Sequence, residues 1–203
     1  MAQELLLPSF YLPTISYFKT IKDCNGFVKI EALEHFQKQT FRTRTKIATA
    51  NGILELIVPI IHGKKDRVVM KDIRINYDHP WQRLHWLSIQ TAYRSSAYFE
   101  YYEDDLMPFY NKKYEFLLDF NMEQLNLMLK LLKLDPSISL TEEYKSVEPN
   151  FIDYRVAIHP KKESLIPNQK PYYQTFEDKV GFIPDLSIVD LIFNQGPQAK
   201  NFL

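Results

Sequence analysis

In the first part of the chain, apolar residues form short runs, and these runs are separated by residues typical of turns. Residues 4–11 begin with a leucine-rich run of strand length that stops near two prolines, which predicts a buried first strand. Apolar residues then recur at a spacing of three, which predicts a helix over residues 15–22 with Thr14 as its N-cap. Because apolar and polar positions alternate over residues 27–32, we expect a second strand there.

The clearest local pattern is a pair of β-prone runs within residues 41–61, on either side of Asn51-Gly52. Asn-Gly readily takes the two positive φ angles of a type I′ turn. The pattern therefore predicts a β-hairpin that turns at these two residues. A further strand is expected over residues 68–76.

The middle of the chain changes to helical spacing. Pro80 lies where a first-turn proline is tolerated, and apolar residues crowd positions 81–93, so a helix is expected there. Residues 98–110 and 113–134 continue the helical pattern, with a break expected at residues 119–121.

The last third of the chain has weaker periodicity. A short strand is expected over residues 137–144, and residues 147–184 indicate a long ordered loop with brief strands. A loop of that length in a compact domain is more often functional than a short one. The final helix is expected over residues 187–193, followed by Gly196 as a left-handed stop and Pro197 as a break.

These elements predict one α/β (or α+β) domain over residues 1–203. We expect a mixed sheet, an antiparallel hairpin around Asn51-Gly52, a central helical region and a C-terminal helix. With 45% hydrophobic residues, the chain has enough apolar material for one core.

Charge, hydropathy and cysteine content narrow the classes of partner. The 25 basic and 25 acidic residues balance, so no overall field draws the chain to nucleic acid. No membrane span is expected, and the N-terminal residues lack the basic start of a signal peptide, which predicts a cytoplasmic protein. Cys24 is the only cysteine, which excludes an internal disulfide and a zinc site built on several thiolates. No metal site is expected, and the sequence leaves the cofactor unknown.

A row of cations before Asn51 is the best candidate for a binding site. If the segment is extended, Lys38, Arg42, Arg44 and Lys46 project to one face, because side chains alternate along a strand. Such a row can bind phosphate or carboxylate, and Gln39 is expected to join it. The alternative is a solvated hairpin face whose cations pair with nearby glutamates.

His85 is the centre of a second candidate, within a helix that also carries two tryptophans. A histidine with a pKa near neutrality can serve as acid or base, and Arg83 can hold an anion beside it. The alternative is a packed, hydrogen-bonded core histidine.

The second half of the chain adds two more candidates. Arg155 and His159 would share a face of an extended segment and meet a bound anion, although surface exposure alone also explains them. Asp190 falls among apolar neighbours, where a carboxylate needs a cationic or hydrogen-bonding partner, and Asn194 sits at the end of the same helix. Asp185 or Ser187 can cap that helix, and capping is the expected role of Asp185.

Several segments in a fixed order resemble the bacterial WbqC-like protein family. The segments are Tyr11-Leu-Pro13, Ser16-Tyr-Phe18, Lys38 to Arg44 with Ile47 to Gly52, Val58-Pro59, Trp81 to Trp86, and Phe182 to Asn194 with Gly196-Pro197. The resemblance runs nearly end to end, and its most specific part is the last segment. It implies a bacterial cytoplasmic protein of surface-polysaccharide (O-antigen) biosynthesis that transfers an aminoacyl or acyl group to a sugar.

The chain departs from the family pattern in two places. Many members carry His-Gln-Pro before Tyr-Leu-Pro, where this chain has Leu6-Leu-Pro8. Many also carry a Ser-Gly-Pro-rich segment that is absent here. The family's chemistry is therefore not expected to transfer unchanged.

Two functional hypotheses follow. The first is a transferase that acts on a small phosphate- or carboxylate-bearing donor and a sugar or sugar-nucleotide acceptor. In it the basic row binds the donor, His85 deprotonates the acceptor and Asp190 orients a partner group. The rival is a non-catalytic binding or assembly protein whose Tyr-rich segment, residues 93–114, forms a partner surface or joins a homo-oligomer.

Overall fold

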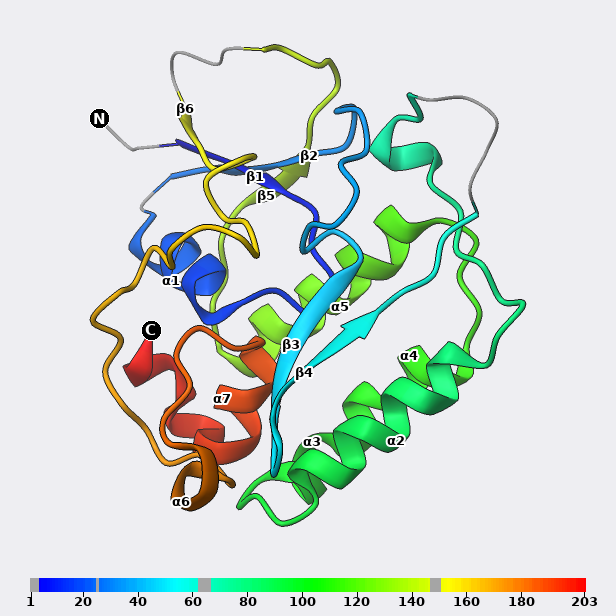
Figure 1. The fold of residues 1–203 in the computed structure, drawn as a ribbon. Coiled ribbons are helices and arrows are strands. Elements are labelled where there is room, and N and C mark those ends of the chain that lie inside the picture. The colour runs from blue at the N-terminus through cyan, green and yellow to red at the C-terminus, as the bar shows by residue number, and fades with distance from the viewer. Residues whose placement is uncertain (1–3, 25, 62–66, 147–150) are drawn as a thin grey trace.

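The computed structural model describes residues 4–24, 26–61, 67–146 and 151–203. A four-stranded parallel sheet lies at the top of the molecule as drawn in Figure 1, with the helices and the hairpin below it. Its strands, in spatial order, are β5 (Ile138–Leu140), β2 (Val28–Glu31), β1 (Glu4–Pro8) and β6 (Phe151–Asp153). Leu5, Leu6 and Leu7 of β1 are all buried, because a strand inside a parallel sheet is covered on both faces. The predicted buried first strand and the α/β class are confirmed.

Helix α1 (Ile15–Asp23) connects β1 to its parallel neighbour β2. A parallel pair needs such a crossover, because its strands cannot be joined by a tight turn. Ile15, Phe18 and Ile21 are all buried, as their spacing predicts. Thr14 holds the N-cap position, but its side chain makes no capping hydrogen bond.

The hairpin consists of β3 (Arg44–Thr49) and β4 (Gly52–Ile57) and forms a sheet of its own. Its turn differs from the predicted one. Thr49 pairs with Gly52, so the turn residues are Ala50 and Asn51, and Gly52 rather than Asn51 has a positive φ, of 100°. A turn followed by a left-handed glycine is the usual form of a three-residue hairpin loop.

The strand expected over residues 68–76 is wrong. This segment forms the 3-10 helix η1 (Met70–Asp72) with isolated bridges on either side. Met70 and Lys71 donate backbone hydrogen bonds to the carbonyls of Glu34 and Ala32, so the segment follows the loop after β2 instead of joining a ladder.

The central helices are α2 (Trp81–Tyr93), α3 (Phe99–Leu106), α4 (Pro108–Asn111) and α5 (Leu117–Leu131). The break expected at residues 119–121 is wrong, because α5 is continuous there. Asp119 faces solvent, while Asn121 is buried and its amide donates to the carbonyl of Arg42. Both polar residues are therefore accommodated without ending the helix.

The C-terminal part runs from β6 through a mostly irregular segment to α6 (Glu177–Val180), α7 (Ile188–Gln195) and η2 (Gly196–Phe202). Residues 147–150 of the predicted loop lie outside the described residues. Gly196 has φ 51° and ends α7, and a Cβ there would lie 2.4 Å from the Tyr98 ring. Pro197 does not end helical structure as predicted, since it lies in the first turn of the 3-10 helix η2.

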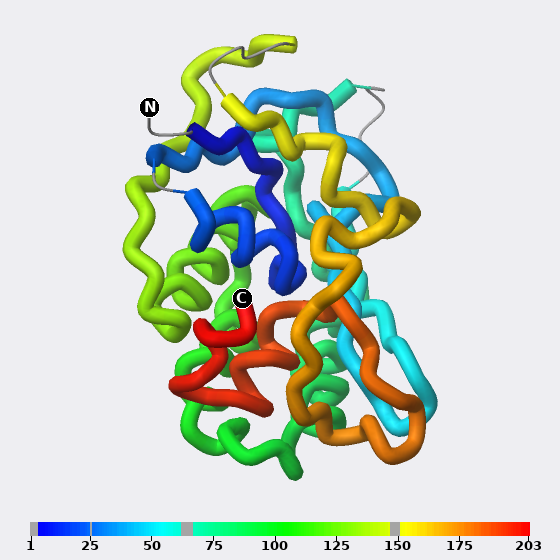
Figure 2. Tube along the Cα trace, turned by 90° about the vertical axis from the view of Figure 1, so that its left-hand side faces the viewer, coloured from blue at the N-terminus to red at the C-terminus, as the bar shows by residue number. Residues whose placement is uncertain are grey.

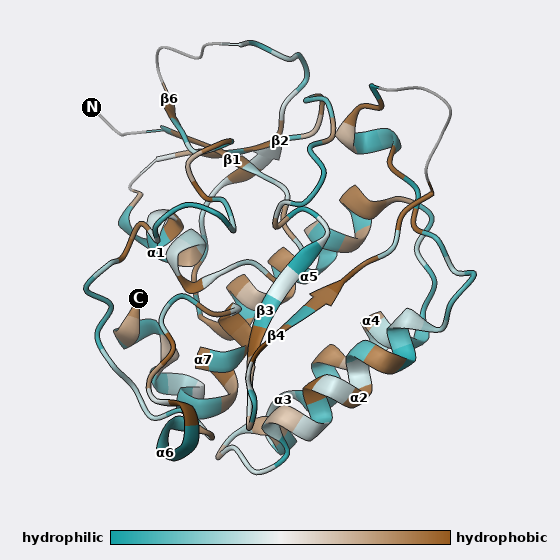
Figure 3. Cartoon of the chain, viewed as in Figure 1, coloured by the Kyte–Doolittle hydropathy of each residue, from teal (hydrophilic) through white to brown (hydrophobic). Residues whose placement is uncertain are grey.

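Buried residues from β1, α1, α2, α5 and α7 join in one hydrophobic core. Hydrophobic colour accordingly concentrates where these elements meet, while α6 on the outside is hydrophilic (Figure 3). The turned view places the C-terminal segment next to α1 (Figure 2). In the described ranges no helix has both the length and the apolar character needed to cross a bilayer.

Candidate functional site

A cavity of about 160 Å³ lies where the hairpin, the loop 158–165 and the turn before α7 meet. We call it the hairpin cavity. Apolar side chains such as Phe41, Ile158 and Leu186 form part of its wall. Its polar and charged lining residues are Ser16, Lys46, His159, Lys162, Glu163, Ser164 and Asp185.

Lys46 reaches the cavity because of the alternation of β3. Thr45 and Ile47 are buried, so Lys46 between them points to the other, half-exposed side. The strand is fixed there, since the Lys46 carbonyl accepts a 2.8 Å hydrogen bond from the Ser187 backbone N–H. Within the described ranges, neither Lys46 nor Lys162 has an acidic partner at ion-pair distance.

His159 is a third polar group of the cavity wall, beside Lys46 and Lys162, and it can donate a hydrogen bond. Its Nδ1 accepts a 3.1 Å hydrogen bond from the Lys161 backbone N–H, so the neutral ring carries its proton on Nε2. Burial lowers the pKa of His159 below 6.5, and the charges of Lys161 and Lys162 lower it further. The ring is therefore neutral at pH 7 and offers Nε2–H to an acceptor.

Asp185 organises the wall of the cavity. Its Oδ1 accepts from the Ser16 backbone N–H at 2.8 Å, and its Oδ2 accepts from the Ser164 hydroxyl at 2.6 Å. Its own N–H donates to Gln169 at 2.7 Å. Asp185 thus caps α1 rather than the final helix for which a cap was expected, and it does so from a left-handed backbone with φ 52°.

Arg42 does not belong to an exposed cationic row. It is 1% exposed, and its Nε and Nη2 each donate a 2.7 Å hydrogen bond to the carboxylate of Glu34. Arg42 precedes β3, and Lys38 and Gln39 lie further back on an exposed loop, so period-two alternation does not apply to these three. The predicted single face of four cations is therefore wrong.

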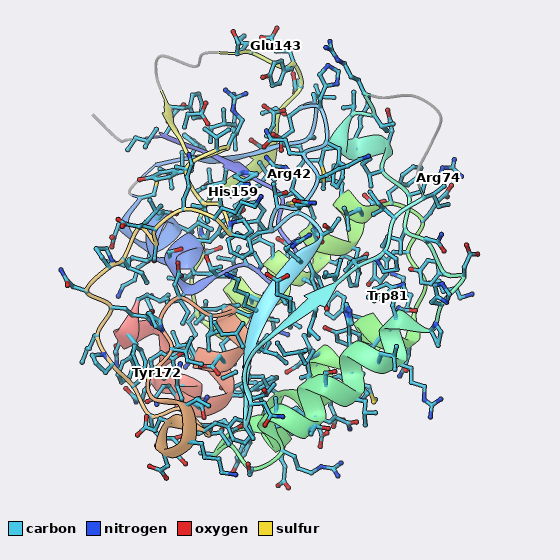
Figure 4. All side chains as sticks on the ribbon, in the orientation of Figure 1. Arg42, Arg74, Trp81, Glu143, His159 and Tyr172 are labelled. Atoms are coloured by element: carbon cyan, nitrogen blue, oxygen red, sulfur yellow. The ribbon has the colours of Figure 1, made fainter. Side chains whose placement is uncertain are left out.

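The positive charge of Arg42 nevertheless affects the cavity residue His159. Together with Arg44, it contributes to the lowered pKa of His159. Figure 4 shows Arg42 and His159 near one another between the parallel sheet and the hairpin. Arg44 itself pairs with Glu55 of β4 at 3.2 Å, which agrees with the expected alternative of a hairpin face paired with glutamates.

Arg155 lies at the carboxyl ends of β2 and β6, and its guanidinium forms ion pairs within the protein. It pairs with Asp153 at 2.6 Å and with Glu31 at 3.0 Å, and it is 5% exposed. Its backbone carbonyl accepts from Arg42 Nη2 at 3.2 Å, so the two arginines share one buried network. Arg155 and His159 are close in sequence, but only His159 lines the cavity.

His85 is buried on α2, away from the cavity lining. Its Nδ1 shares a 2.9 Å hydrogen bond with the Tyr11 hydroxyl, and the ring also hydrogen-bonds the Ile57 carbonyl. Burial lowers its pKa to about 4. Trp81, whose ring lies 5.1 Å from that of His85, appears across the hairpin from His159 in Figure 4. The histidine that lines the same cavity as Lys46 of β3 is therefore His159 and not His85.

Asp190 lies inside α7, where its carboxylate forms no ion pair within the described ranges and is held by hydrogen bonds instead. Its carboxylate accepts from the hydroxyls of Tyr93 (2.9 Å) and Tyr172 (2.5 Å) and from the Gln174 amide (3.1 Å). Burial raises its pKa to about 6, against the lowering effect of these hydrogen bonds. The Asn194 amide donates to the Asp190 carbonyl within α7, and its Oδ1 accepts a 3.0 Å hydrogen bond from the Thr175 hydroxyl, so both residues tie α7 to the preceding segment.

The remaining predicted groups are on the surface or in the core. Arg83 is exposed on α2 and is not part of the cavity wall. In the Tyr-rich segment Phe99, Phe109 and Tyr110 are buried, while Tyr101 is 77% exposed. The segment therefore mainly fills the core instead of forming a continuous aromatic surface.

Four polar or charged cavity residues were neither predicted sites nor a predicted helix cap: Ser16, Lys162, Glu163 and Ser164. Lys162 follows the predicted His159 closely, so the run of basic residues after Pro160 was a usable signal. Ser16 and Ser164 meet only through Asp185, far away in sequence, and no local pattern indicates such a meeting.

Comparison with known proteins gives two matches. The family model described as the WbqC-like protein family matches residues 9–164. The uncharacterized protein Rv1507c of Mycobacterium tuberculosis is 23% identical over 230 aligned residues, which cover 100% of this chain and 98% of the relative. No solved structure matches the chain significantly.

Proposed function

Because the chain belongs to the WbqC-like protein family, we propose that it is a transferase that holds the anionic part of its donor in the hairpin cavity. One observation carries the proposal. Lys46 comes from β3, and His159 and Lys162 come from a loop far along the chain, yet all three line the same small cavity. No carboxylate in the described ranges neutralises the two lysines by an ion pair.

The three groups suit a phosphate or carboxylate ligand. Lys46 and Lys162 supply positive charge, and the neutral His159 supplies a directed N–H donor. The carboxylates of Asp185 and Glu163 lie in the same wall. Both oxygens of Asp185 accept hydrogen bonds, from Ser16 and Ser164, and Glu163 forms no ion pair with either lysine in the described ranges. These contacts favour a role for Asp185 in fixing the wall.

The reaction class rests on the family resemblance, which implies acyl or aminoacyl transfer to a sugar or sugar nucleotide for cell-surface polysaccharides. In such a transfer from an acyl phosphate, the acceptor oxygen or nitrogen bonds to the acyl carbon while the bond from that carbon to the phosphate oxygen breaks. The leaving phosphate keeps the electron pair and takes the acceptor's proton. Lys46 and Lys162 would stabilise the charge that develops on this phosphate.

His85 and Asp190 stay predictions as catalytic residues. Each makes its polar contacts inside the protein, and neither lines the hairpin cavity. The proposal therefore gives anion binding to the cavity residues and assigns no acid or base.

Calorimetric titration tests the binding step. Inorganic phosphate, an acyl phosphate and a sugar nucleotide are titrated into the wild type and the Lys46→Ala/Lys162→Ala variant at low salt. We expect binding to the wild type and at least a tenfold loss in the variant, with no change in Lys71→Ala, an exposed lysine outside the cavity. Equal affinity in all three proteins would remove the proposal. Mass spectrometry of acceptor sugars incubated with the donors that bind then tests the transfer itself.

A further inference from the structure

A second cavity, of about 380 Å³, lies between α1, residues 165–170 and the end of η2. Figures 1 and 2 both show the C-terminal segment next to α1. Lys22 fixes this arrangement, since its Nζ donates to the carbonyl oxygens of Lys200 and Leu203 at 2.9 and 2.8 Å. The volume falls within the range of about 300–1,000 Å³ that small-molecule sites occupy.

The wall of this cavity combines apolar surface with ammonium groups. Leu165, Ile166 and Phe202 supply the apolar part, and Lys19 and Lys170 line the same space. Lys19 is paired with Asp23 at 2.8 Å. Lys170 has no acidic partner in the described ranges, and its Nζ lies 4.8 Å from the centre of the Phe202 ring.

Gln169, also in this wall, has an unused donor. The side chain is 9% exposed, and its Oε1 accepts the Asp185 N–H. That bond fixes which end of the amide is oxygen, and the other end, Nε2, has no hydrogen-bond partner in the described ranges. Buried donors in native proteins are nearly always paired, so this amide is open to an acceptor from outside the chain, a water or a ligand group.

We propose that this cavity is a second ligand site, for a small organic acid with an apolar body. Its carboxylate is held by Lys170 and the free amide of Gln169, and its body packs on Ile166 and Phe202. The site does not depend on the proposed transferase function, since none of these four residues lines the hairpin cavity.

The two cavities share a connection through Asp185. Ser164 and Gln169, at the two ends of the strap 164–169, are both hydrogen-bonded to Asp185, and Leu165 between them lines both cavities. A ligand in the second cavity would therefore contact Gln169, whose side chain accepts the hydrogen bond from the Asp185 N–H.

The test uses benzoate and hexanoate as probes, with benzamide as the uncharged control. Amide chemical shifts of residues 165–170 are followed by NMR during titration into the whole chain. We expect both acids, and not benzamide, to shift these resonances and the Gln169 side-chain amide with saturation.

Two variants make the test specific. Gln169→Glu keeps the acceptor for Asp185 and replaces the free donor by an oxygen, so acid binding should fall at least tenfold. Lys170→Ala should weaken it several-fold, while Lys179→Ala, an exposed lysine elsewhere, should bind as the wild type does. If Gln169→Glu does not fold, Lys170→Ala decides. Absence of saturable shifts at 20 mM acid, or unchanged affinity in Lys170→Ala, would overturn the proposal.

Discussion

The hydroxyl of Ser164 donates a 2.6 Å hydrogen bond to the carboxylate of Asp185, across a sequence separation of 21 residues. The other carboxylate oxygen caps α1 through the Ser16 N–H. One side chain therefore joins the cavity loop, the first helix and the turn before α7. Asp185 accepts a left-handed backbone in this position, which costs energy that its contacts must offset.

Substitutions at Asp185 separate its backbone from its side chain. Asp185→Ala loses the hydrogen bonds and keeps the unfavourable φ, whereas Asp185→Gly loses the same bonds but tolerates φ 52°. We expect Asp185→Ala to be less stable than Asp185→Gly by about 1 kcal/mol in urea unfolding. Equal stabilities would show that the left-handed backbone is not strained.

The buried pair of Arg42 and Glu34 is expected to be essential for stability. Arg42→Ala leaves the Glu34 carboxylate buried without a partner, which should lower the free energy of unfolding by about 3–5 kcal/mol. Arg83→Ala, at an exposed position, should change it by less than about 0.5 kcal/mol. A small effect of Arg42→Ala, with the pair intact in the wild type, would contradict the buried geometry.

His85 should make stability depend on pH in the acidic range. Its pKa in the folded chain is about 4, below the ordinary 6.5, so the stability it confers is complete above pH 6.5 and is lost as pH falls towards 4. The shift corresponds to about 3 kcal/mol. The difference in unfolding free energy between the wild type and His85→Gln should shrink by roughly this amount from pH 7 to pH 4. A difference independent of pH would mean that the ring is not buried.

Asp190 should make the free energy of unfolding depend on pH in the opposite direction. Its pKa in the folded chain is about 6, above the ordinary 3.8, so its contribution is complete below pH 3.8 and is lost as pH rises through 6. The stability of the wild type relative to Asp190→Asn should therefore fall by about 2.4 kcal/mol between pH 4 and pH 7. Chemical denaturation at several pH values measures this, and a relative stability that rises with pH would be inconsistent with the buried carboxylate.

Local patterns predicted most of the fold. The leucine run of β1, the spacing of three in α1 and the apolar crowding of α2 each have one physical meaning, and each element formed as expected. The strand expected over residues 68–76 failed because a nearby loop offered Glu34 and Ala32 as backbone acceptors in place of a strand partner. These acceptors are brought close by the tertiary structure, and no pattern in the local sequence predicts them.

The candidate site was only half visible from the sequence. Lys46 and His159 were identified as separate anion-binding groups, and the fold brings them to one cavity. Arg42 was misjudged because its acidic partner lies in the preceding loop, where no periodicity marks a buried pair. Side chains that act through contacts far apart in the chain, such as Asp185, require the fold itself.

The most direct test of the hairpin cavity is the pKa of His159, measured by NMR with and without phosphate. In the free protein it should lie below 6.5, because the ring is partly buried beside Lys161 and Lys162. Phosphate bound in the cavity should raise it, since an adjacent anion favours the charged ring, and Lys46→Ala/Lys162→Ala should abolish this response. A His159 pKa that phosphate leaves unchanged, at concentrations up to 50 mM, would contradict the assignment of the cavity as an anion site.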